Sequence, residues 1–527
     1  VTTVCDTSFA SAARTMNEAS EEASERDPMV AESADAVQTG TKPSYSQTRK
    51  NNPRAFEDSL GGLVAIRRRR CSCCTCRRFG MCCSCFWPTL ALAVVVAHLL
   101  WDNLPETSPV RLWPRQIAAS NTYNWLLQPS DTARKGREYF ESQSPLIEAS
   151  ARNFECLDYW CKNLTVPSVH TDWYELLTHR YDNMLQKMRA DPRADDFRME
   201  KNKCDMYDWF ELNHFRSMKV IYRWSAKGEW GTTPVTKDAV VRELLANKTK
   251  HPYPMFMKTC HITQGWAHST RLLRSYERVS QGRDELDGWV SSMWDIRADD
   301  WERPWAAAHN ALTDTLAPGS MLQELYPGNF VWWESPEAEQ DGAVVELKVY
   351  VIWGHVYAAS VHTLIILRDG TYESYPDNPE ASWWARFRTM RHGSSPTPYL
   401  HWLKSEGHLD RVFLMAEAGA LVAGMDMVRF DFFCRKGSPD AVAFNENSIS
   451  SARSPVYHHH FDYMSYLWAQ GHAERWYKPF DPHGKRTYEL TLKREGHPNR
   501  QRLKQLLEDK PDAAQGAGLS LEEATTA

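Results

Sequence analysis

The sequence lacks a broad basic surface. Its 62 lysines and arginines are outnumbered by 67 aspartates and glutamates, the formal net charge is -5, and the one dense basic run is Arg67–Arg70. Proteins that bind nucleic acid neutralise phosphates with lysines and arginines gathered on one face or stripe. We therefore expect no nucleic-acid partner.

Two sequence patterns of catalysis are missing as well. The chain contains no Asp-x-Asp triplet, which metal-dependent Golgi glycosyltransferases usually need on a loop after a strand. It also offers no convincing Ser-His-Asp or Cys-His arrangement, so a mechanism through a covalent nucleophile has no candidate residues.

Aromatic residues are scarce in the first 60 positions, which are rich in Ser, Thr, Ala, Glu and Asp. Such a composition cannot bury enough apolar surface to offset the entropy of ordering, so we predict a disordered cytosolic tail over residues 1–66. All 22 tryptophans follow residue 86, and 42% of the residues in the whole chain are hydrophobic. The rest of the chain can therefore bury a sizeable core in two or three lobes.

Only one long hydrophobic run occurs, Phe86–Trp101. It is uncharged and just shorter than the roughly 17–25 residues of a membrane-spanning helix. Arginines precede it, whereas Asp102 and Glu106 follow it, so the positive-inside bias predicts a cytosolic N-terminus and a translocated C-terminal part. We predict a single-pass type II signal anchor at 86–101, with the following domain in the lumen of the Golgi or another secretory compartment. A buried helix of a soluble protein is the alternative.

Most of the cysteines fall into two groups. Residues 67–85 form a basic juxtamembrane segment with seven cysteines, whose irregular spacing favours S-acylation over zinc binding. Five more follow the predicted anchor. In an oxidising lumen Cys156 and Cys161 would close a short loop and leave an odd thiol among the rest. Cys260 and Cys434 are expected to be buried small hydrophobic residues.

Other features bear on the luminal topology and on metal binding. Two sequons, at Asn163 and Asn247, would be glycosylated in a secretory lumen. The triplet His458–His460 suggests a metal site, but three consecutive histidines cannot all face one ion, so we predict a surface cluster.

Hydrophobic periodicity and turn residues predict a mixture of helices and strands. Helices are predicted over Tyr174–Met188, the start of Met206–Trp224, Arg271–Val279, Glu285–Asp300, Trp301–Leu316, parts of Thr371–Arg391 and of Tyr399–Ala423, and Asn499–Glu508. Strands are predicted at the end of Met206–Trp224 and over Pro254–Lys258, Asn329–Trp333 and Val344–Trp353, with Gly354 in a hairpin turn. The last 17 residues, from Pro511, are predicted to be disordered.

The stretch Met425–Ser450 carries a pair of acids on a predicted hairpin with a Gly-Ser-Pro-Asp turn at 437–440. Counting back from that turn puts Asp431 opposite Glu446, with Cβ atoms roughly 4.5–5.5 Å apart. Carboxylates held this close repel, so the pair would protonate or capture a divalent cation. Mg²⁺ is commonly bound by one or two carboxylates together with phosphates. A hairpin whose acids face water is the alternative.

This hairpin also carries a family resemblance. MVRFDFF at 427–433 and AFNENS at 443–448 resemble the C-terminal metal-binding strands of ATP-grasp enzymes, most closely the TupA-like (teichuronopeptide biosynthesis) branch, with its v-R-v-D-f-Y and f-x-E-x-T patterns. At those positions this chain has Arg429, Asp431, Phe433, Glu446 and Ser448. The resemblance implies that Asp431, Glu446 and Ser448 hold Mg²⁺ and that Arg429 is catalytic.

Two further blocks agree in the family's order. PMFMKTCHITQG at 254–265 resembles the F-V-l-K-x-x-H-g-s-G block, and residues 330–358 resemble the i-v-E-x-y-l … d-Y-K-f-y-x-F-x-G-k block. The resemblance implies that Glu334 lines the adenine or ribose site and that Lys348 both binds nucleotide and takes part in catalysis. The residues it assigns to ATP binding are Lys258, His261, Gly265, Glu334 and Lys348.

The resemblance implies an α+β ATP-grasp domain at 200–476, whose two lobes grip ATP. A helical stem at 102–199 precedes it, and a mostly disordered tail at 477–527 follows. ATP-grasp ligases activate a carboxylate as an acylphosphate for attack by an amine or other nucleophile, here with a carbohydrate or other carboxylate-bearing acceptor on a polysaccharide or glycoconjugate. The family's phosphate loop has several glycines and this one has only Gly265, so a non-catalytic nucleotide- or glycan-binding relative is one alternative. A type II Golgi glycosyltransferase, suggested by topology and aromatic content, is another.

Overall fold

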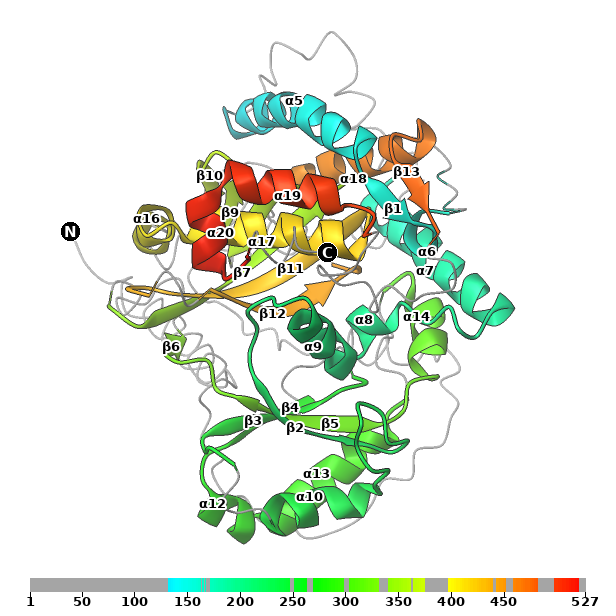
Figure 1. Cartoon of the computed structure of the whole chain (residues 1–527), viewed down its shortest axis with the longest axis vertical. Coiled ribbons are helices and arrows are strands. Elements are labelled where there is room, and N and C mark those ends of the chain that lie inside the picture. The colour runs from blue at the N-terminus through cyan, green and yellow to red at the C-terminus, as the bar shows by residue number, and fades with distance from the viewer. Residues whose placement is uncertain are drawn as a thin grey trace, which may run out of the picture. The chain divides into compact units, whose positions relative to one another are not determined.

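The computed structural model describes residues 131–162, 164, 166, 171–246, 251–262, 269–297, 303–330, 340–361, 364–374, 397–438, 442–451, 458–481 and 497–520. They belong to the unit Pro129–Ala527 and form helices with three separate sheets, which agrees with the predicted α+β class (Figure 1). The predicted tail, cysteine-rich segment and membrane anchor lie outside the described residues. Among the described helices, none is both long and apolar enough to span a bilayer.

The largest sheet has seven strands in the order β10-β9-β8-β7-β11-β12, with β6 beside β7. Its two long strands, β7 and β11, are rich in β-branched and aromatic residues, which favour strands. All its pairings are antiparallel except β6 with β7. The strands are β6 (Asn329–Phe330), β7 (Ala343–Ile352), β8 (His355–Val361), β9 (Leu364–Leu367), β10 (Tyr372–Ser374), β11 (Met427–Arg435) and β12 (Ala443–Ser448). Gly354 adopts a φ of 70° at the turn between β7 and β8, where a hairpin was predicted.

Helix α17 (His408–Ala423) packs against β7, β8 and β11 and is buried along most of its length. A Cβ atom on Gly419 would lie 2.9 Å from the ring of Phe430, so the absence of a side chain at this position lets the helix approach the sheet. Helices α19 (Arg500–Asp509) and α20 (Pro511–Ala517) pack on α17 in turn (Figure 1). The expectation of disorder from Pro511 is therefore wrong for 511–520, because the small residues of α20 pack closely on α17.

A second, four-stranded antiparallel sheet has the order β2-β5-β3-β4. One face is covered by two helices, and tryptophan, methionine and valine side chains fill the core between them (Figure 1). The predicted helix Arg271–Val279 is wrong in its first half, because Thr270–Leu273 extends the sheet as β4. The elements are β2 (Val220–Ser225), β3 (Met255–Thr259), β4 (Thr270–Leu273), β5 (Gly319–Glu324), α10 (Lys237–Ala246), α12 (Tyr276–Gln281) and α13 (Arg283–Asp295).

The remaining elements surround the seven-stranded sheet. A small parallel sheet pairs β1 with β13, so residues from the predicted stem and the predicted tail share one sheet. The predicted helix Tyr174–Met188 is confirmed as α7, and its buried leucines and methionine face the large core. The elements are α5 (Asp131–Arg152), β1 (Glu155–Leu157), α6 (Asp158–Cys161), α7 (Trp173–Ala190), α8 (Arg198–Lys201), α9 (Lys203–Leu212), α14 (Ala306–Thr313), α16 (Thr397–Ser405), α18 (His458–Ala473) and β13 (Lys478–Phe480).

A buried charge pair fixes the start of β11. Asp426 is fully buried and forms an ion pair with Arg180 of α7, which lies 4.9 Å from the ring centroid of Trp468. Its carboxylate also accepts hydrogen bonds from the indole of Trp468 at 2.7 Å and from Nε2 of His472 at 2.8 Å, both on α18. Arg180 in turn donates to the carbonyl of Met427 at 2.9 Å. The pair therefore joins α7, α18 and β11.

Arg180→Met is expected to lower the free energy of unfolding by roughly 3–5 kcal/mol, because it leaves the buried Asp426 carboxylate without its cation. Chemical denaturation monitored by tryptophan fluorescence measures this. Arg193→Met is the control, because Arg193 is 79% exposed where it pairs with Asp191, and it should leave the stability unchanged. A loss no larger in the Arg180 variant than in the control would contradict the role given to the pair.

Burial, together with the nearby Arg180 cation, lowers the pKa of His472 from 6.5 to about 3. The unfolded chain takes up a proton at this histidine below about pH 6.5 while the folded protein does not, so stability falls as the pH falls towards about 3. In His472→Gln the loss of unfolding free energy between pH 6.5 and pH 5 should be about 2 kcal/mol smaller than in the wild type. Equal losses in denaturation curves at the two pH values would show that His472 titrates normally in the fold.

Candidate functional site

The structure brings charged residues of three strands onto one face of the large sheet. Asp431 of β11 is the register partner of Lys348 on β7 and of Glu446 on β12. Directly opposed residues share a face, so the predicted pairing of the two acids is confirmed. A bulge after Asp431 shifts the register on the turn side, where Phe432 pairs with Phe444.

Asp431 is compensated by a cation of its own strand. Its two carboxylate oxygens accept hydrogen bonds from Nε and Nη2 of Arg429 at 2.6 and 2.8 Å, and Nζ of Lys348 lies 3.8 Å away. Nη1 of Arg429 donates to Oγ of Ser451 at 2.7 Å. Burial alone would lower the pKa of Arg429, but the Asp431 carboxylate raises it above its usual range. The two opposed acids therefore do not face each other as a bare carboxylate pair.

Glu346 and Lys348 lie two residues apart on β7, so they share this face. Lys348 Nζ is 3.6 Å from Oε2 of Glu346, and Asn445 donates to Oε1 of Glu346 at 2.7 Å. Burial is the main cause that raises the pKa of the Glu346 carboxyl, and Asp431 adds to it although Lys348 opposes both. The Asp431 charge is the main cause that raises the pKa of Lys348. Glu346 and Lys348 thus form an ion pair along one strand.

Lys258 comes from the other sheet. On β3, Met257 points into the small core, so its neighbour Lys258 faces the opposite way. Burial and then the charge of Lys203 lower the pKa of Lys258 to about 8, and the charges of Glu446 and Glu346 act against them. The charges that act on Lys258 thus include carboxylates of the large sheet. Sequence reasoning missed Lys203, for which no motif gave a signal.

Tyr207 of α9 contributes to the same place. The ammonium of Lys258 lies 5.8 Å from the centroid of its ring, and its hydroxyl donates to the carbonyl of Asn445 at 2.8 Å. An aromatic ring under a lysine holds the cation in place and limits its hydration. Tyr207 was included in the predicted helix-to-strand segment without a role.

The other predicted site residues lie in different surroundings. Nδ1 of the buried His261 accepts a hydrogen bond from the backbone N–H of Gly319 at 3.3 Å, which is a structural contact. The hydroxyl of Ser448, predicted as a metal ligand, lies 3.3 Å from Oε1 of Glu200 in a buried polar cluster. Gly265 and Glu334 lie outside the described residues, and so do the two sequon asparagines.

Two disulfides occur among the described residues. The predicted bond between Cys156 and Cys161 is present. A second bond joins Cys204 of α9 to Cys260, the residue after β3, so Cys260 is not the free hydrophobic residue that was expected. Cys434 is the odd thiol, and burial raises its pKa. The Cys204–Cys260 bond ties the end of the Lys258 strand to a helix that packs on β12.

The prediction of a surface cluster at His458–His460 is wrong for two of its members. His460 is fully buried, and His459 is 12% exposed at its side chain. Nε2 of His459 lies 3.0 Å and Nε2 of His460 lies 3.1 Å from the two carboxylate oxygens of Glu373 on β10. No motif connected Glu373 to the histidines, because it lies more than 80 positions earlier in the chain.

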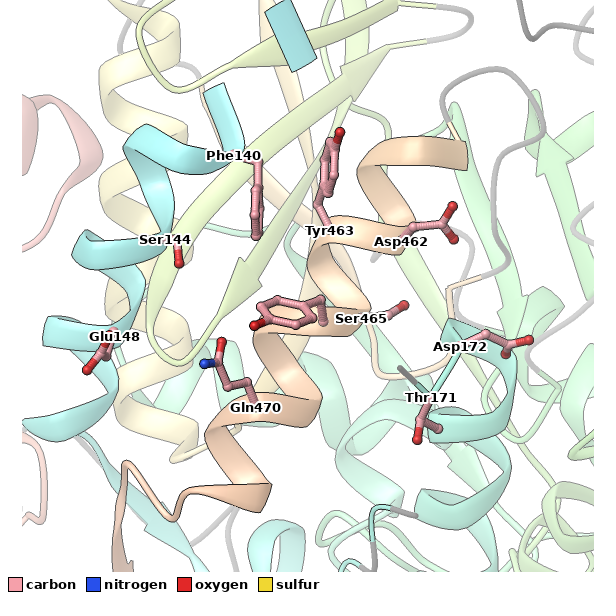
Figure 2. Close-up of a pocket in the computed structure, with 10 residues that line it drawn as sticks. Phe140, Ser144, Glu148, Thr171, Asp172, Asp462, Tyr463, Ser465 and Gln470 are labelled. Carbon is pink, nitrogen blue, oxygen red and sulfur yellow. The ribbon is translucent and has the colours of Figure 1, made fainter. Parts of the chain in front are cut away.

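A pocket of about 490 Å³ opens elsewhere, between α5, the start of α7 and α18. Figure 2 shows the rings of Phe140 and Tyr463 side by side in it, and their centroids are 4.6 Å apart. Its charged residues are Glu148, Asp172 and Asp462, with no lysine or arginine among the lining residues. Such a lining repels phosphates and carboxylates, so this pocket does not suit a nucleotide.

The charged face of the large sheet has the opposite character. It holds two cations and three carboxylates, and Lys258 of β3 adds a third cation from the other sheet. The residues of the face are Lys348, Arg429, Glu346, Asp431 and Glu446. Lysines next to carboxylates suit a polyphosphate that arrives with a divalent cation, because each new charge meets one of the opposite sign. The oxygen donors of Asp431 and Glu446 are the kind that Mg²⁺ prefers.

No protein-family model matches the chain. No curated protein matches it either. Among solved structures, the chain resembles the D-cycloserine synthetase DcsG at 11% identity and a TM-score of 0.26, over 53% of this chain and 71% of that one. It also resembles an L-amino acid ligase from Bacillus licheniformis at 9% identity and a TM-score of 0.26, over 56% of this chain and 55% of that one. A TM-score this low does not by itself establish a shared fold.

The double variant Cys204→Ser/Cys260→Ser is expected to lose about 4 kcal/mol of unfolding free energy, because the bond closes a loop with a sequence separation of 56. Cys156→Ser/Cys161→Ser, with a separation of 5, is the matched control and should lose only about 2 kcal/mol. Denaturant unfolding measures both, after peptide mapping without reductant has verified the two bonds. An equal or larger loss of unfolding free energy in the control would contradict the assignment of the Cys204–Cys260 bond, which closes the longer loop.

Proposed function

We propose that residues 200–476 form an ATP-grasp domain that acts as an ATP- and Mg²⁺-dependent ligase. The observation that supports this most directly is the contact of Lys258, from the four-stranded sheet, with the ring of Tyr207, whose hydroxyl donates to the carbonyl of Asn445 on the seven-stranded sheet. Two sheets that face one charged site agree with the two-lobed grip that the sequence resemblance implies.

The residues of the charged face fit ATP and Mg²⁺. Glu446 is partly exposed, and Asp431 lies opposite it, so both supply oxygen atoms on one face. Lys258 and Lys348 supply two ammonium groups for phosphates. Bound Mg²⁺ would neutralise phosphate charge. Ser448 is left out of this set because its hydroxyl contacts Glu200.

In the proposed reaction the γ-phosphoryl group passes to a substrate carboxylate, and an amine or other nucleophile then attacks the acylphosphate carbonyl and displaces phosphate. The protein contributes positioning and charge. Lys258 and Lys348 orient the phosphates and offset their charge. Arg429 positions Asp431, because all three of its guanidinium nitrogens donate within the protein to Asp431 or Ser451.

The substrate and the location complete the proposal. The acceptor is a carboxylate-bearing carbohydrate on a polysaccharide or glycoconjugate, as the sequence resemblance suggests. A luminal position behind the predicted type II anchor is supported by two disulfides, since such bonds persist in oxidising compartments.

The close Arg429–Asp431 pairing favours one alternative, a protein that binds nucleotide without turnover. In that protein Asp431 would remain hydrogen-bonded to Arg429 when ATP binds, and the binding of Mg²⁺ would depend on Glu446 alone. ATP binding without acylphosphate formation, tested with hydroxylamine as a trap and uronic-acid oligosaccharides as acceptors, distinguishes this alternative from the ligase.

Calorimetry of the purified protein with ATP is expected to show Mg²⁺-dependent binding that weakens roughly 10–100-fold in Lys258→Met, because a charge-assisted hydrogen bond is lost. Glu446→Gln should remove most of the Mg²⁺ dependence. Glu285→Gln is the control, since Glu285 is 77% exposed on α13, and it should bind as the wild type does.

Asp431→Asn should weaken binding as well, and its melting temperature must be measured alongside because Arg429 loses its partner. Unchanged ATP affinity in both Lys258→Met and Glu446→Gln would overturn the proposed site. Binding of a sugar nucleotide in place of ATP would favour the glycosyltransferase.

A further inference from the structure

Three side chains outside the charged face converge in a buried cluster, the Glu373–His459–His460 cluster. Glu373 comes from β10, an edge strand of the large sheet, and the two histidines come from the first turn of α18. One ligand atom from each residue lies within 4.8 Å of the others, and all three residues offer groups that bind metal ions.

The spacing suits a small tetrahedral ion. Zinc binds histidine nitrogen and carboxylate oxygen at about 2.0–2.2 Å, which separates neighbouring tetrahedral ligands by roughly 3.3 Å. Each histidine nitrogen lies near a different oxygen of Glu373, at 3.0 Å for His459 and 3.1 Å for His460. A metal ion would therefore fit with small movements of the side chains.

Two buried polar atoms of the cluster meet in an ion pair whose geometry is poor for a hydrogen bond. They are Nε2 of His460 and Oε1 of Glu373, which lie 3.1 Å apart. The exposed fractions of the two residues are 0% and 8%. Poor hydrogen-bond geometry compensates buried polar atoms only in part, and a shared cation would satisfy both.

The surroundings complete a metal site. The hydroxyl of Tyr357 lies 3.0 Å from Nδ1 of His460, where it can fix the tautomer that leaves Nε2 free for a metal. Gly136 of α5 faces the cluster, and a Cβ atom there would lie 3.1 Å from Nε2 of His459 and 3.4 Å from Oε1 of Glu373. The absence of a side chain at Gly136 thus lets α5 approach the ligands closely.

A second group of potential ligands, formed by Cys161, Asp426 and His472, lacks these features. Cys161 is in a disulfide, and Asp426 pairs with Arg180 and accepts hydrogen bonds from Trp468 and His472. Its carboxylate is therefore fully compensated within the protein. The contrast makes the Glu373–His459–His460 cluster the better candidate.

We infer that the Glu373–His459–His460 cluster binds one divalent transition-metal ion of the zinc class. Two imidazoles and one carboxylate favour zinc or cobalt over Mg²⁺ and Ca²⁺, which prefer oxygen ligands. The ion would join the edge strand β10 to the start of α18. The site is separate from the proposed Mg²⁺ site, since the two share no residue.

The test is a cobalt titration of the full-length protein, followed by visible absorption, with zinc then added as a competitor. The thiols are first alkylated under native conditions and bound metal is removed with a chelator, because the seven cysteines at 67–85 would also take up metal. The wild type should bind one equivalent that gives the absorption of a four-coordinate nitrogen and oxygen site, and zinc should displace it.

The affinity for this one equivalent of cobalt should be at least 100-fold weaker in His459→Gln and in Glu373→Gln. His401→Gln, which removes an exposed histidine of α16, should bind it as the wild type does. Tyr357→Phe keeps all three ligands and the ring, and should bind roughly 10–100-fold more weakly because the outer partner of His460 is lost.

Melting curves with and without zinc accompany each titration. Zinc should raise the melting temperature of the wild type and of His401→Gln, and leave that of His459→Gln unchanged. Absence of cobalt binding in folded wild-type protein, or equal binding in the wild type, His459→Gln and Tyr357→Phe, would overturn the inference.

Discussion

The buried ion pair between Asp426 and Arg180 is the constraint on which the charged face depends. It lies directly before β11, and it holds that strand to α7 and α18 through the side chains of Trp468 and His472. A one-residue slip of a strand would move every side chain to the other face. The pair therefore does more than add stability, because it fixes which face of the sheet Asp431 occupies.

The charge balance of this face follows from how the two sheets are joined. The Cys204–Cys260 bond holds the end of β3 near α9, so Lys258 reaches the acids of β7 and β12. Each lysine there already has a carboxylate neighbour. A polyphosphate that arrived alone would leave those carboxylates facing negative charge, and a divalent cation removes that cost. The arrangement of charges thus supports the proposed use of Mg²⁺, independently of any sequence resemblance.

Local patterns in the sequence predicted much of the fold and of the charged face. Contacts between residues far apart in the sequence were the main features that they did not predict. Counting back from the turn paired Asp431 with Glu446 correctly. It did not predict the bulge after Asp431, which shifts the pairs nearer the turn by one residue. The Cys204–Cys260 bond and the contact of Glu373 with the two histidines join residues far apart in the chain, so no spacing indicated them. Helix α20 was missed because alanine and glycine resemble a flexible tail, although they pack closely on α17.

Whether Asp431 can bind Mg²⁺ depends on two free energies, that of its pairing with Arg429 and that of its binding to the metal ion. In this structure both oxygens of Asp431 accept hydrogen bonds from the guanidinium, so the residue can bind Mg²⁺ only by sharing or releasing that partner. A ligand shifts such an equilibrium only by its difference in affinity for the two arrangements. Under the proposed function, Mg²⁺ with ATP would offer that difference, because the phosphates would supply new acceptors for the freed guanidinium of Arg429. The depleted glycine loop predicted from the sequence would then affect how tightly the phosphates are held, whereas the strength of the Arg429–Asp431 pair would decide whether the metal site forms.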